Sequence, residues 1–175
     1  MGKRSGKLLK KRLRLVMWFL IRFNLLAIPL YLAIYTNFSF QPLQAVIAQI
    51  TTVILKVQGY DVIQNDQTVI ANSDGNIYPI EISWDSTGWK SLYALFALVM
   101  AVPFSSIDRK LRFLAMGLPA IFVLNLTRIL TTILIALNFG FQYFDVVHTL
   151  LWREGLIIAV VLLWYYWLRE NHNIR

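Results

Sequence analysis

Apolar stretches of membrane-spanning length are the feature that most restricts the folds open to this chain of 175 residues. The hydrocarbon core of a bilayer is about 30 Å thick, and about 20 apolar helical residues cross it. Runs near that length lie over 13–36, 87–104, 113–138 and 148–168. Because backbone inside lipid must satisfy its own hydrogen bonds, each run is expected to be a helix. The sequence predicts an all-α integral membrane helical bundle, a single domain over 1–175 with about four spanning helices.

Basic residues flank the apolar runs and indicate their orientation. Seven of the 17 lysines and arginines lie in the first 14 residues, and three more, Arg109, Lys110 and Arg112, lie in the linker before the third run. Such residues mark the cytoplasmic side of a membrane. We therefore expect a multi-pass protein of the plasma membrane with a basic cytoplasmic N-terminus over 1–12 and a cytoplasmic tail over 169–175. This placement of the charge favours membrane lipids as partners and argues against nucleic acid.

The segment between the first two runs divides into two parts. Residues 41–58 are too polar for a clear span, and both of their ends are expected outside, so we predict a re-entrant or interfacial helix. Residues 60–85 hold five of the nine acidic residues and no lysine or arginine. Alternating runs over 68–71 and 77–82 flank Ser73-Asp74-Gly75-Asn76, and Asp-Gly in that context signals a hairpin. We expect a small extracytoplasmic β-hairpin or three-stranded meander over 60–85.

Three polar side chains interrupt the apolar helices on their outer side. Counted from the cytoplasmic ends at about 1.5 Å per residue, Ser86 lies at roughly 27 Å, Arg128 at roughly 22 Å and His148 at roughly 30 Å. All three can therefore meet in the outer part of the bilayer if their helices are neighbours. An arginine far from both helix ends needs a buried partner or a water-filled cavity, which favours a functional role for Arg128. Ser86 also fits a helix cap, and His148 fits an interfacial histidine.

Two classes other than an enzyme remain open. Asn125 lies one turn before Arg128 on the same helix face, so the pair can hold helices together in a non-enzymatic membrane assembly or chaperone protein. Arg128 can also line the polar pathway of a small transporter subunit, although the apolar run Leu92–Met100 offers little for one. With no cysteine and two histidines, a metal centre has few ligands, and no cofactor is expected.

The second half of the chain, about 85–150, resembles the exosortase/archaeosortase family of membrane transpeptidases. The resemblance rests on Asp85-Ser86-Thr87-Gly88-Trp89-Lys90, Lys110-Leu111-Arg112 with Gly117, Asn125-Leu126-Thr127-Arg128, and His148. The short length is similar to that of archaeal-type members. In that family a cysteine directly before Thr-Gly or Ser-Gly forms the site with an arginine and a histidine. The resemblance thus implies a site of Ser86, Arg128 and His148, with support from Asp85, Thr87, Gly88, Lys90, Asn125 and Asp145.

Serine at position 86 departs from the family pattern, because a serine does not readily form the anion that a cysteine nucleophile uses. Three explanations remain open. The residue is an engineered replacement of cysteine, which the absence of any other cysteine favours, or a natural variant that reacts through serine, or the mark of an inactive relative that still binds substrate. The interpretation that we carry forward is an inactivated Cys-to-Ser chain.

Cysteine-protease-like chemistry is what the resemblance implies. A helix N-terminus favours a thiolate at position 86, and Lys90 either adds charge there or contacts headgroups. Arg128 suits the stabilisation of an oxyanion, and His148 suits a general base and then acid. Asp145 caps the helix of that histidine or orients its imidazole. The implied substrates are secreted or surface proteins with a C-terminal motif, a transmembrane helix and a basic tail, cut outside the membrane and passed to a lipid or other amine acceptor.

Overall fold

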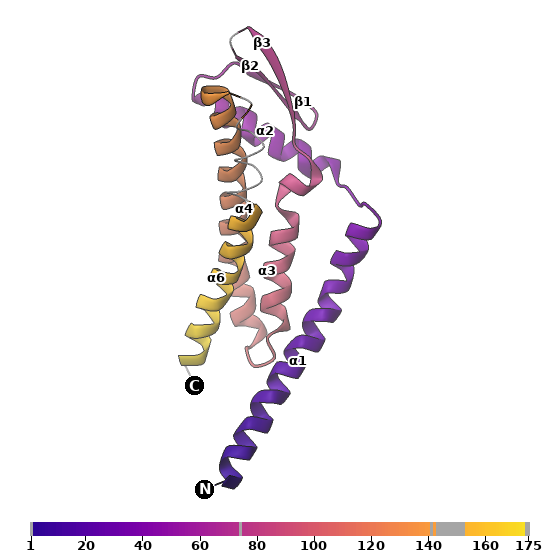
Figure 1. Ribbon diagram of the computed structural model, residues 1–175, viewed down its shortest axis with the longest axis vertical. Helices are drawn as coiled ribbons and strands as arrows, with labels where there is room; N and C mark the ends of the chain where they lie inside the picture. Colours follow the sequence, from indigo (N-terminus) through magenta and orange to yellow (C-terminus); the bar gives the residue numbers. More distant parts are fainter. Residues whose placement is uncertain (1, 74, 141, 143–152, 174–175) are drawn as a thin grey trace. The chain divides into compact units, whose positions relative to one another are not determined.

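The computed structural model describes residues 2–73, 75–140, 142 and 153–173 (Figure 1). Most of them lie in helices: α1 (Gly2–Tyr35), α2 (Gln41–Val57), α3 (Trp89–Ala101), α4 (Ile107–Phe139) and α6 (Arg153–Asn173). The segment between α2 and α3 contains the strands β1 (Val62–Asn65), β2 (Thr68–Ser73) and β3 (Asn76–Glu81) and the short 3-10 helix η1 (Trp84–Thr87). The expected helical class with a small sheet between the first helices is confirmed.

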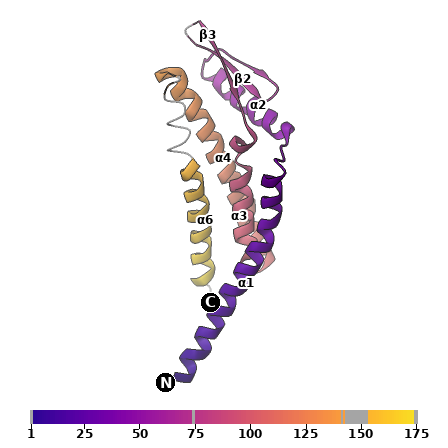
Figure 2. The same cartoon turned by 45° about the vertical axis from the view of Figure 1, so that its right-hand side comes forward.

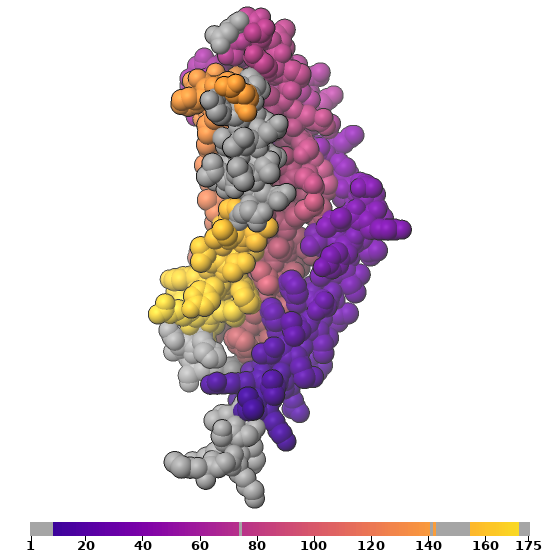
Figure 3. Space-filling model, in the orientation of Figure 1, coloured from indigo at the N-terminus to yellow at the C-terminus, as the bar shows by residue number. Residues whose placement is uncertain are grey.

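Two of the described helices are long and apolar enough to cross a membrane, Leu9–Tyr35 and Ile107–Phe139. They correspond to the predicted runs 13–36 and 113–138. The side chains of α1 stand on the surface along most of the helix (Figure 3), and almost none of its apolar window is buried, as suits a lipid-facing helix. The predicted run 148–168 lies partly outside the described residues.

Helix α3 is shorter than the span predicted over 87–104. It has 13 residues, which extend about 20 Å at 1.5 Å per residue. Its start is fixed by Gly88, whose φ of 77° is left-handed, and it ends at Ala101, two residues before Pro103. A residue that precedes proline is disfavoured in the helical region. A crossing of the bilayer by this helix alone is therefore not confirmed, and neither is the total of four spans.

The basic cluster that we expected in a linker lies on a helix instead. Helix α4 begins at Ile107, so Arg109, Lys110 and Arg112 belong to its first turns. Ser106 directly precedes it, and serine is favoured at that position. Lys110 is buried, and its Nζ donates to the carbonyl of Met100 at 2.9 Å. This bond satisfies one of the last carbonyls of α3, which have no partner inside their own helix.

The chain divides into two compact units. The first comprises Met1–Phe38, Leu92–Pro119 and Val160–Arg175. Within it, the hydroxyl of Tyr93 donates to the carbonyl of Leu26 at 2.6 Å, so α3 contacts α1 at this point (Figure 2). The ring of Phe19 stacks on that of Trp164. Aromatic contacts and one short hydrogen bond thus hold these helices together.

The second unit comprises Ser39–Ser91 and Ala120–Ala159 and contains the sheet. The strands form an antiparallel meander in the order β1-β2-β3, which confirms the three-stranded form of the prediction. Gly75, with a φ of 77°, lies in the turn between β2 and β3. One face of the sheet packs with α2 and α4 in a core that includes Ile47, Leu55, Val69, Ala71, Ile80, Ile82, Ile129 and Ile133. This core fixes the end of β3 against α4.

Candidate active site

The residues around position 86 form η1 and a tight turn, not the first turn of α3. Ser83 has the N-cap position of η1, and its side chain accepts a hydrogen bond from the amide of Ser86 at 3.3 Å. The interpretation of Ser86 as a helix cap is therefore wrong. Since η1 has only four residues, the dipole of a full helix, which we expected to assist position 86, does not begin there.

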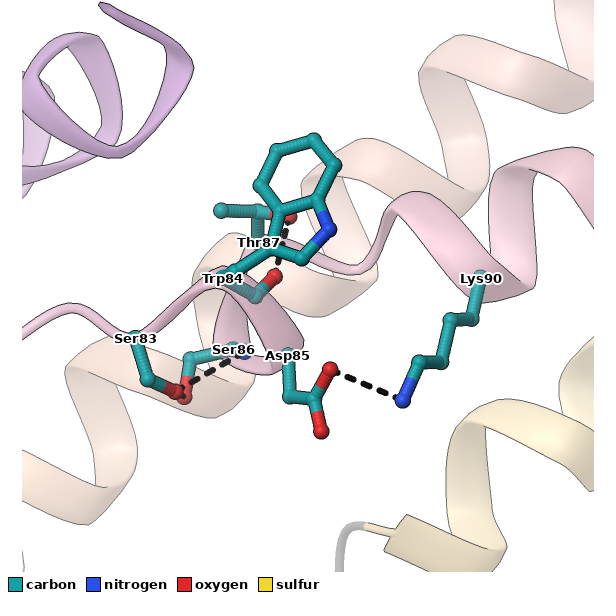
Figure 4. A network of polar contacts seen from close by, with 6 residues as sticks. All are labelled: Ser83, Trp84, Asp85, Ser86, Thr87 and Lys90. Atoms are coloured by element: carbon teal, nitrogen blue, oxygen red, sulfur yellow. Dashed lines mark hydrogen bonds and ion pairs between the residues drawn. The ribbon is translucent and has the colours of Figure 1, made fainter. Parts of the chain in front are cut away.

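Ser86 is half-buried, and its hydroxyl lies next to a second hydroxyl. Its Oγ is 2.9 Å from the Oγ of Ser83, a hydrogen-bond distance (Figure 4). On the backbone side, the carbonyl of Ser86 accepts a hydrogen bond from Nδ2 of Asn125 at 3.0 Å. Asn125 comes from α4 and is almost fully buried. The side chain of position 86 is thus oriented from within η1, while its backbone is tied to α4.

Gly88 allows η1 to approach α4 this closely. A Cβ atom at Gly88 would lie 2.7 Å from Cγ of Asn125, and the φ of 77° disfavours other residues as well. Thr87 is buried, and its hydroxyl donates to the carbonyl of Trp84 at 2.7 Å. The Thr-Gly pair after position 86 therefore has a structural basis: the threonine closes η1, and the glycine admits the asparagine.

Asp85 and Lys90 form an ion pair on the other side of the turn. The Nζ of Lys90 is 2.8 Å from Oδ1 of Asp85, and the side chains are 42% and 70% exposed, respectively. Figure 4 shows the carboxylate of Asp85 directed toward Lys90 and away from the pair formed by Ser83 and Ser86. Exposed ion pairs of this kind contribute little to stability. Asp85 and Lys90 therefore support the conformation of the turn more than the chemistry of position 86.

Ser86 and Arg128 line the same pocket. Its volume is about 170 Å³, and its walls are residues 80–83 at the end of β3, Ser86 of η1, and Arg128, Ile129, Thr132 and Ile133 of α4. Arg128 is only 7% exposed, and its Nε has no hydrogen-bond partner within the described part of the chain. No carboxylate of the described residues forms an ion pair with it. Among the described residues this buried guanidinium has no counter-charge, which is a costly arrangement, and a negatively charged group in the pocket would supply one.

Two of the expected site residues cannot be placed. His148 and Asp145 lie outside the described residues, so their roles stay predictions. Of the expected supporting residues, Thr87, Gly88 and Asn125 adjoin Ser86 in the turn, whereas Asp85 and Lys90 pair with each other. The described residues include no group of three or more His, Cys, Asp or Glu side chains placed to hold a metal ion.

The comparison with protein families decides the wider assignment. The family described as transmembrane exosortase matches residues 8–167, nearly the whole chain. The chain belongs to the transmembrane exosortase family. No curated protein and no solved structure matches it. Membership and the two apolar helices together make it a membrane protein, and at the level of the family they support a peptidase or transpeptidase type of enzyme.

Sequence reasoning missed three polar residues that line the pocket of this exosortase-family chain, Ser83, Glu81 and Thr132. Ser83 contacts Ser86, and Glu81 lines the wall at the end of β3. The signal for Ser83 was present, because serine is among the residues favoured at an N-cap. Glu81 gave no such signal, since its place in the pocket depends on how the sheet packs on α4.

Proposed function

We propose that this exosortase-family chain holds the site of a membrane transpeptidase, with position 86 as the nucleophile and Arg128 as the oxyanion donor. The observation that supports it is the pocket shared by Ser86 and Arg128, residues that are far apart in the sequence. The substrates are exported proteins with a C-terminal motif, a transmembrane helix and a basic tail. The acyl group at the cleaved motif is then transferred to a lipid or another amine acceptor on the extracytoplasmic side.

The proposed reaction begins when the side chain of position 86 attacks the carbonyl carbon of the scissile peptide bond. The carbonyl oxygen then carries negative charge, and the guanidinium of Arg128, which has no carboxylate partner among the described residues, is suited to donate hydrogen bonds to it. The carbon–nitrogen bond breaks, and the departing amine takes a proton. The amine acceptor then attacks the acyl group and releases position 86. His148 is proposed to carry the protons in both steps.

Serine at position 86 keeps the geometry of the site but lowers its reactivity. A cysteine thiol has a pKa near 8.5 and is partly ionised near neutral pH, whereas a serine hydroxyl needs a base to attack. The partner of the Ser86 hydroxyl within the turn is the hydroxyl of Ser83, which is no base at that pH. We therefore propose that the chain with Ser86 binds its substrate and turns it over poorly, as expected for a Cys-to-Ser replacement.

Cleavage of a reporter library tests this proposal. Each reporter has a randomised segment of about six residues, an apolar helix of about 20 residues and a Lys-Arg tail, and it shares a nanodisc with the full chain. Mass spectrometry detects shortened reporters. We expect cleavage by the S86C variant and none by S86A. In the S86C background, Arg128→Gln should lower the rate by about 100- to 1,000-fold if Arg128 is an oxyanion donor.

The unchanged chain distinguishes the explanations of Ser86. Cleavage at a rate close to that of S86C would identify a natural serine nucleophile, whereas cleavage by S86C alone supports a replaced cysteine. If neither form shortens any reporter, the chain is not a transpeptidase. If Arg128→Gln leaves the cleavage rate of S86C unchanged, position 86 remains the proposed nucleophile, but Arg128 is not the oxyanion donor.

A further inference from the structure

Strand β3 is an edge of the sheet that runs into the pocket. It pairs with β2 on one side, and among the described residues no strand pairs with its other side. Its side chains near that edge are accessible, because Ile77 is 72% exposed and Glu81 is exposed as well. An unpaired edge presents a row of backbone donors and acceptors that another extended chain can use.

The register of the sheet shows which backbone groups face outward. The amide of Ile82 donates to the carbonyl of Gln67 at 2.9 Å, and Thr68 lies opposite Glu81. In an antiparallel pair, residues alternate between those that bond to the neighbouring strand and those whose backbone groups point away from it. The N–H and C=O of Ile80 and the N–H of Ile82 therefore point toward β2, whereas the carbonyl of Ile82 accepts a hydrogen bond from Nε2 of Gln44 on α2 at 3.0 Å. The C=O of Pro79 and both backbone groups of Glu81 point outward.

Pro79 restricts where this edge can be used. Proline has no N–H to donate, and within sheets it is tolerated where the missing donor faces outward from an edge. Beyond Pro79, pairing is therefore weakened, while Glu81 keeps both a donor and an acceptor. The usable part of the edge is the end of β3, and residues 80–83 at this end are also walls of the pocket that contains Ser86 and Arg128.

We propose that the outer edge of β3 binds the extended cleavage motif of the substrate by strand addition and delivers the scissile bond to position 86. Two amides of the peptide, spaced two residues apart, donate to the carbonyls of Pro79 and Glu81. One peptide carbonyl accepts from the amide of Glu81. Main-chain bonds of this kind supply affinity, while pockets for alternate side chains supply specificity. The inference rests on the proposed function, since it names how that site recognises its substrate.

An extended peptide fits this edge better than a lipid or a second copy of the chain. A lipid tail offers no alternating donors and acceptors. A second copy would need a long pairing edge, and Pro79 interrupts this one. A peptide needs only the two or three bonds next to the pocket, and its backbone must be extended there for position 86 to reach the carbonyl carbon.

Glu81→Pro in the S86C background tests the proposal. It removes the outward amide, while the bonds between β2 and β3 remain, because they come from the neighbouring residues. Glu81→Ala is the matched control: it loses the same side chain, including the bond from Nε2 of Gln67 at 2.9 Å, but keeps the amide. With a reporter that S86C cleaves, Glu81→Pro should lower kcat/KM by about 3- to 10-fold relative to Glu81→Ala, as the loss of one backbone hydrogen bond predicts.

Methylation of the peptide amides gives a second measurement. Synthetic versions of the cleaved motif carry one N-methyl group at each position in turn. Strand addition predicts losses of about 3- to 10-fold at two positions separated by one unaffected residue. The rate at which iodoacetamide alkylates the thiol at position 86, the single thiol of the variant, should stay within about twofold of the S86C rate and shows that the turn is intact.

The outcomes separate this inference from the proposed function. If S86C cleaves no reporter, both fail together. If S86C cleaves and Glu81→Pro matches Glu81→Ala, strand addition is wrong and the transpeptidase assignment stands. Losses at consecutive methylated positions, without alternation, also overturn strand addition. If Glu81→Pro abolishes a dimer in the nanodisc but leaves cleavage unchanged, the edge joins two copies of the chain and binds no substrate.

Discussion

Replacement of Gly88 by alanine probes the contact on which the geometry of position 86 depends. Gly88 has a φ of 77°, and an added Cβ would lie 2.7 Å from Cγ and 2.9 Å from Nδ2 of Asn125. That Nδ2 is the donor to the carbonyl of Ser86. Because the three nearest atoms all belong to Asn125, alanine forces this buried side chain to move. We expect Gly88→Ala to destabilise the second unit and to release the backbone of position 86.

Two terms contribute to the loss in the free energy of unfolding that we expect for Gly88→Ala. A left-handed conformation costs a residue with a Cβ about 1–2 kcal/mol. Displacement of Asn125 breaks its bond to Ser86 and leaves a buried polar group unsatisfied, at a cost of about 1–3 kcal/mol. The sum is a loss of about 2–5 kcal/mol in the free energy of unfolding, a large part of the stability of a typical domain.

Gly75 provides a matched control for the first term. It has the same φ of 77°, but a Cβ added there would meet no heavy atom within 4 Å. Gly75→Ala should therefore cost only about 1–2 kcal/mol. The difference between the two variants isolates the displacement of Asn125, about 1–3 kcal/mol, or about 5- to 150-fold in the folding equilibrium.

The assay is unfolding of the full chain in dodecyl maltoside by added sodium dodecyl sulfate, followed by tryptophan fluorescence. Asn125→Ala in the Gly88→Ala background completes a double-mutant cycle. If the clash is real, the second substitution removes part of the loss, so the two effects are less than additive. Equal losses for Gly88→Ala and Gly75→Ala, or strict additivity in the cycle, would refute the reasoning.

Three further predictions concern single polar contacts. In the S86C background, Ser83→Ala removes the hydroxyl next to position 86. Because a hydroxyl that donates to a thiolate stabilises it, the pKa of the thiol should rise and its alkylation at neutral pH should slow. Ser83→Thr keeps a hydroxyl and should preserve both the pKa and the rate, which a pH–rate profile measures. Tyr93→Phe loses the 2.6 Å bond to Leu26 and should cost about 1 kcal/mol in the same unfolding assay. Lys90→Met breaks an ion pair that is largely exposed, so the free energy of unfolding should change by less than about 1 kcal/mol.

The sequence predicted those elements whose signals are local. Apolar runs located α1 and α4, and Asp-Gly between alternating runs located the turn before β3. The boundaries of α3 were missed because Gly88 and Pro103 act on the backbone against an apolar pattern that continues past them. The position of the cap was missed for a different reason: Ser83, Asp85 and Ser86 are all suitable caps, and only the three-dimensional turn selects one of them.

The sequence predicted the depths of Ser86 and Arg128 in the bilayer, but not their lateral positions. The rise of a helix gives the depth of each residue in the bilayer, but it carries no information on lateral position. The two residues lie close together because β3 and α4 pack in one core and Asn125 of α4 bonds to the carbonyl of Ser86 in η1. Glu81 lines the pocket only because of that packing, and no pattern in the sequence predicts it.

Asn125 and Arg128 lie three positions apart on α4, so they project from the same side of one rigid rod. The side-chain amide of Asn125 donates a hydrogen bond to the carbonyl of Ser86, while Arg128 lines the pocket beside it. Any bending or sliding of α4 therefore carries this hydrogen bond and the cation together, and Ser86 moves with them. Thermal motion of the surrounding membrane that displaces α4 can therefore displace Ser86 and Arg128 together.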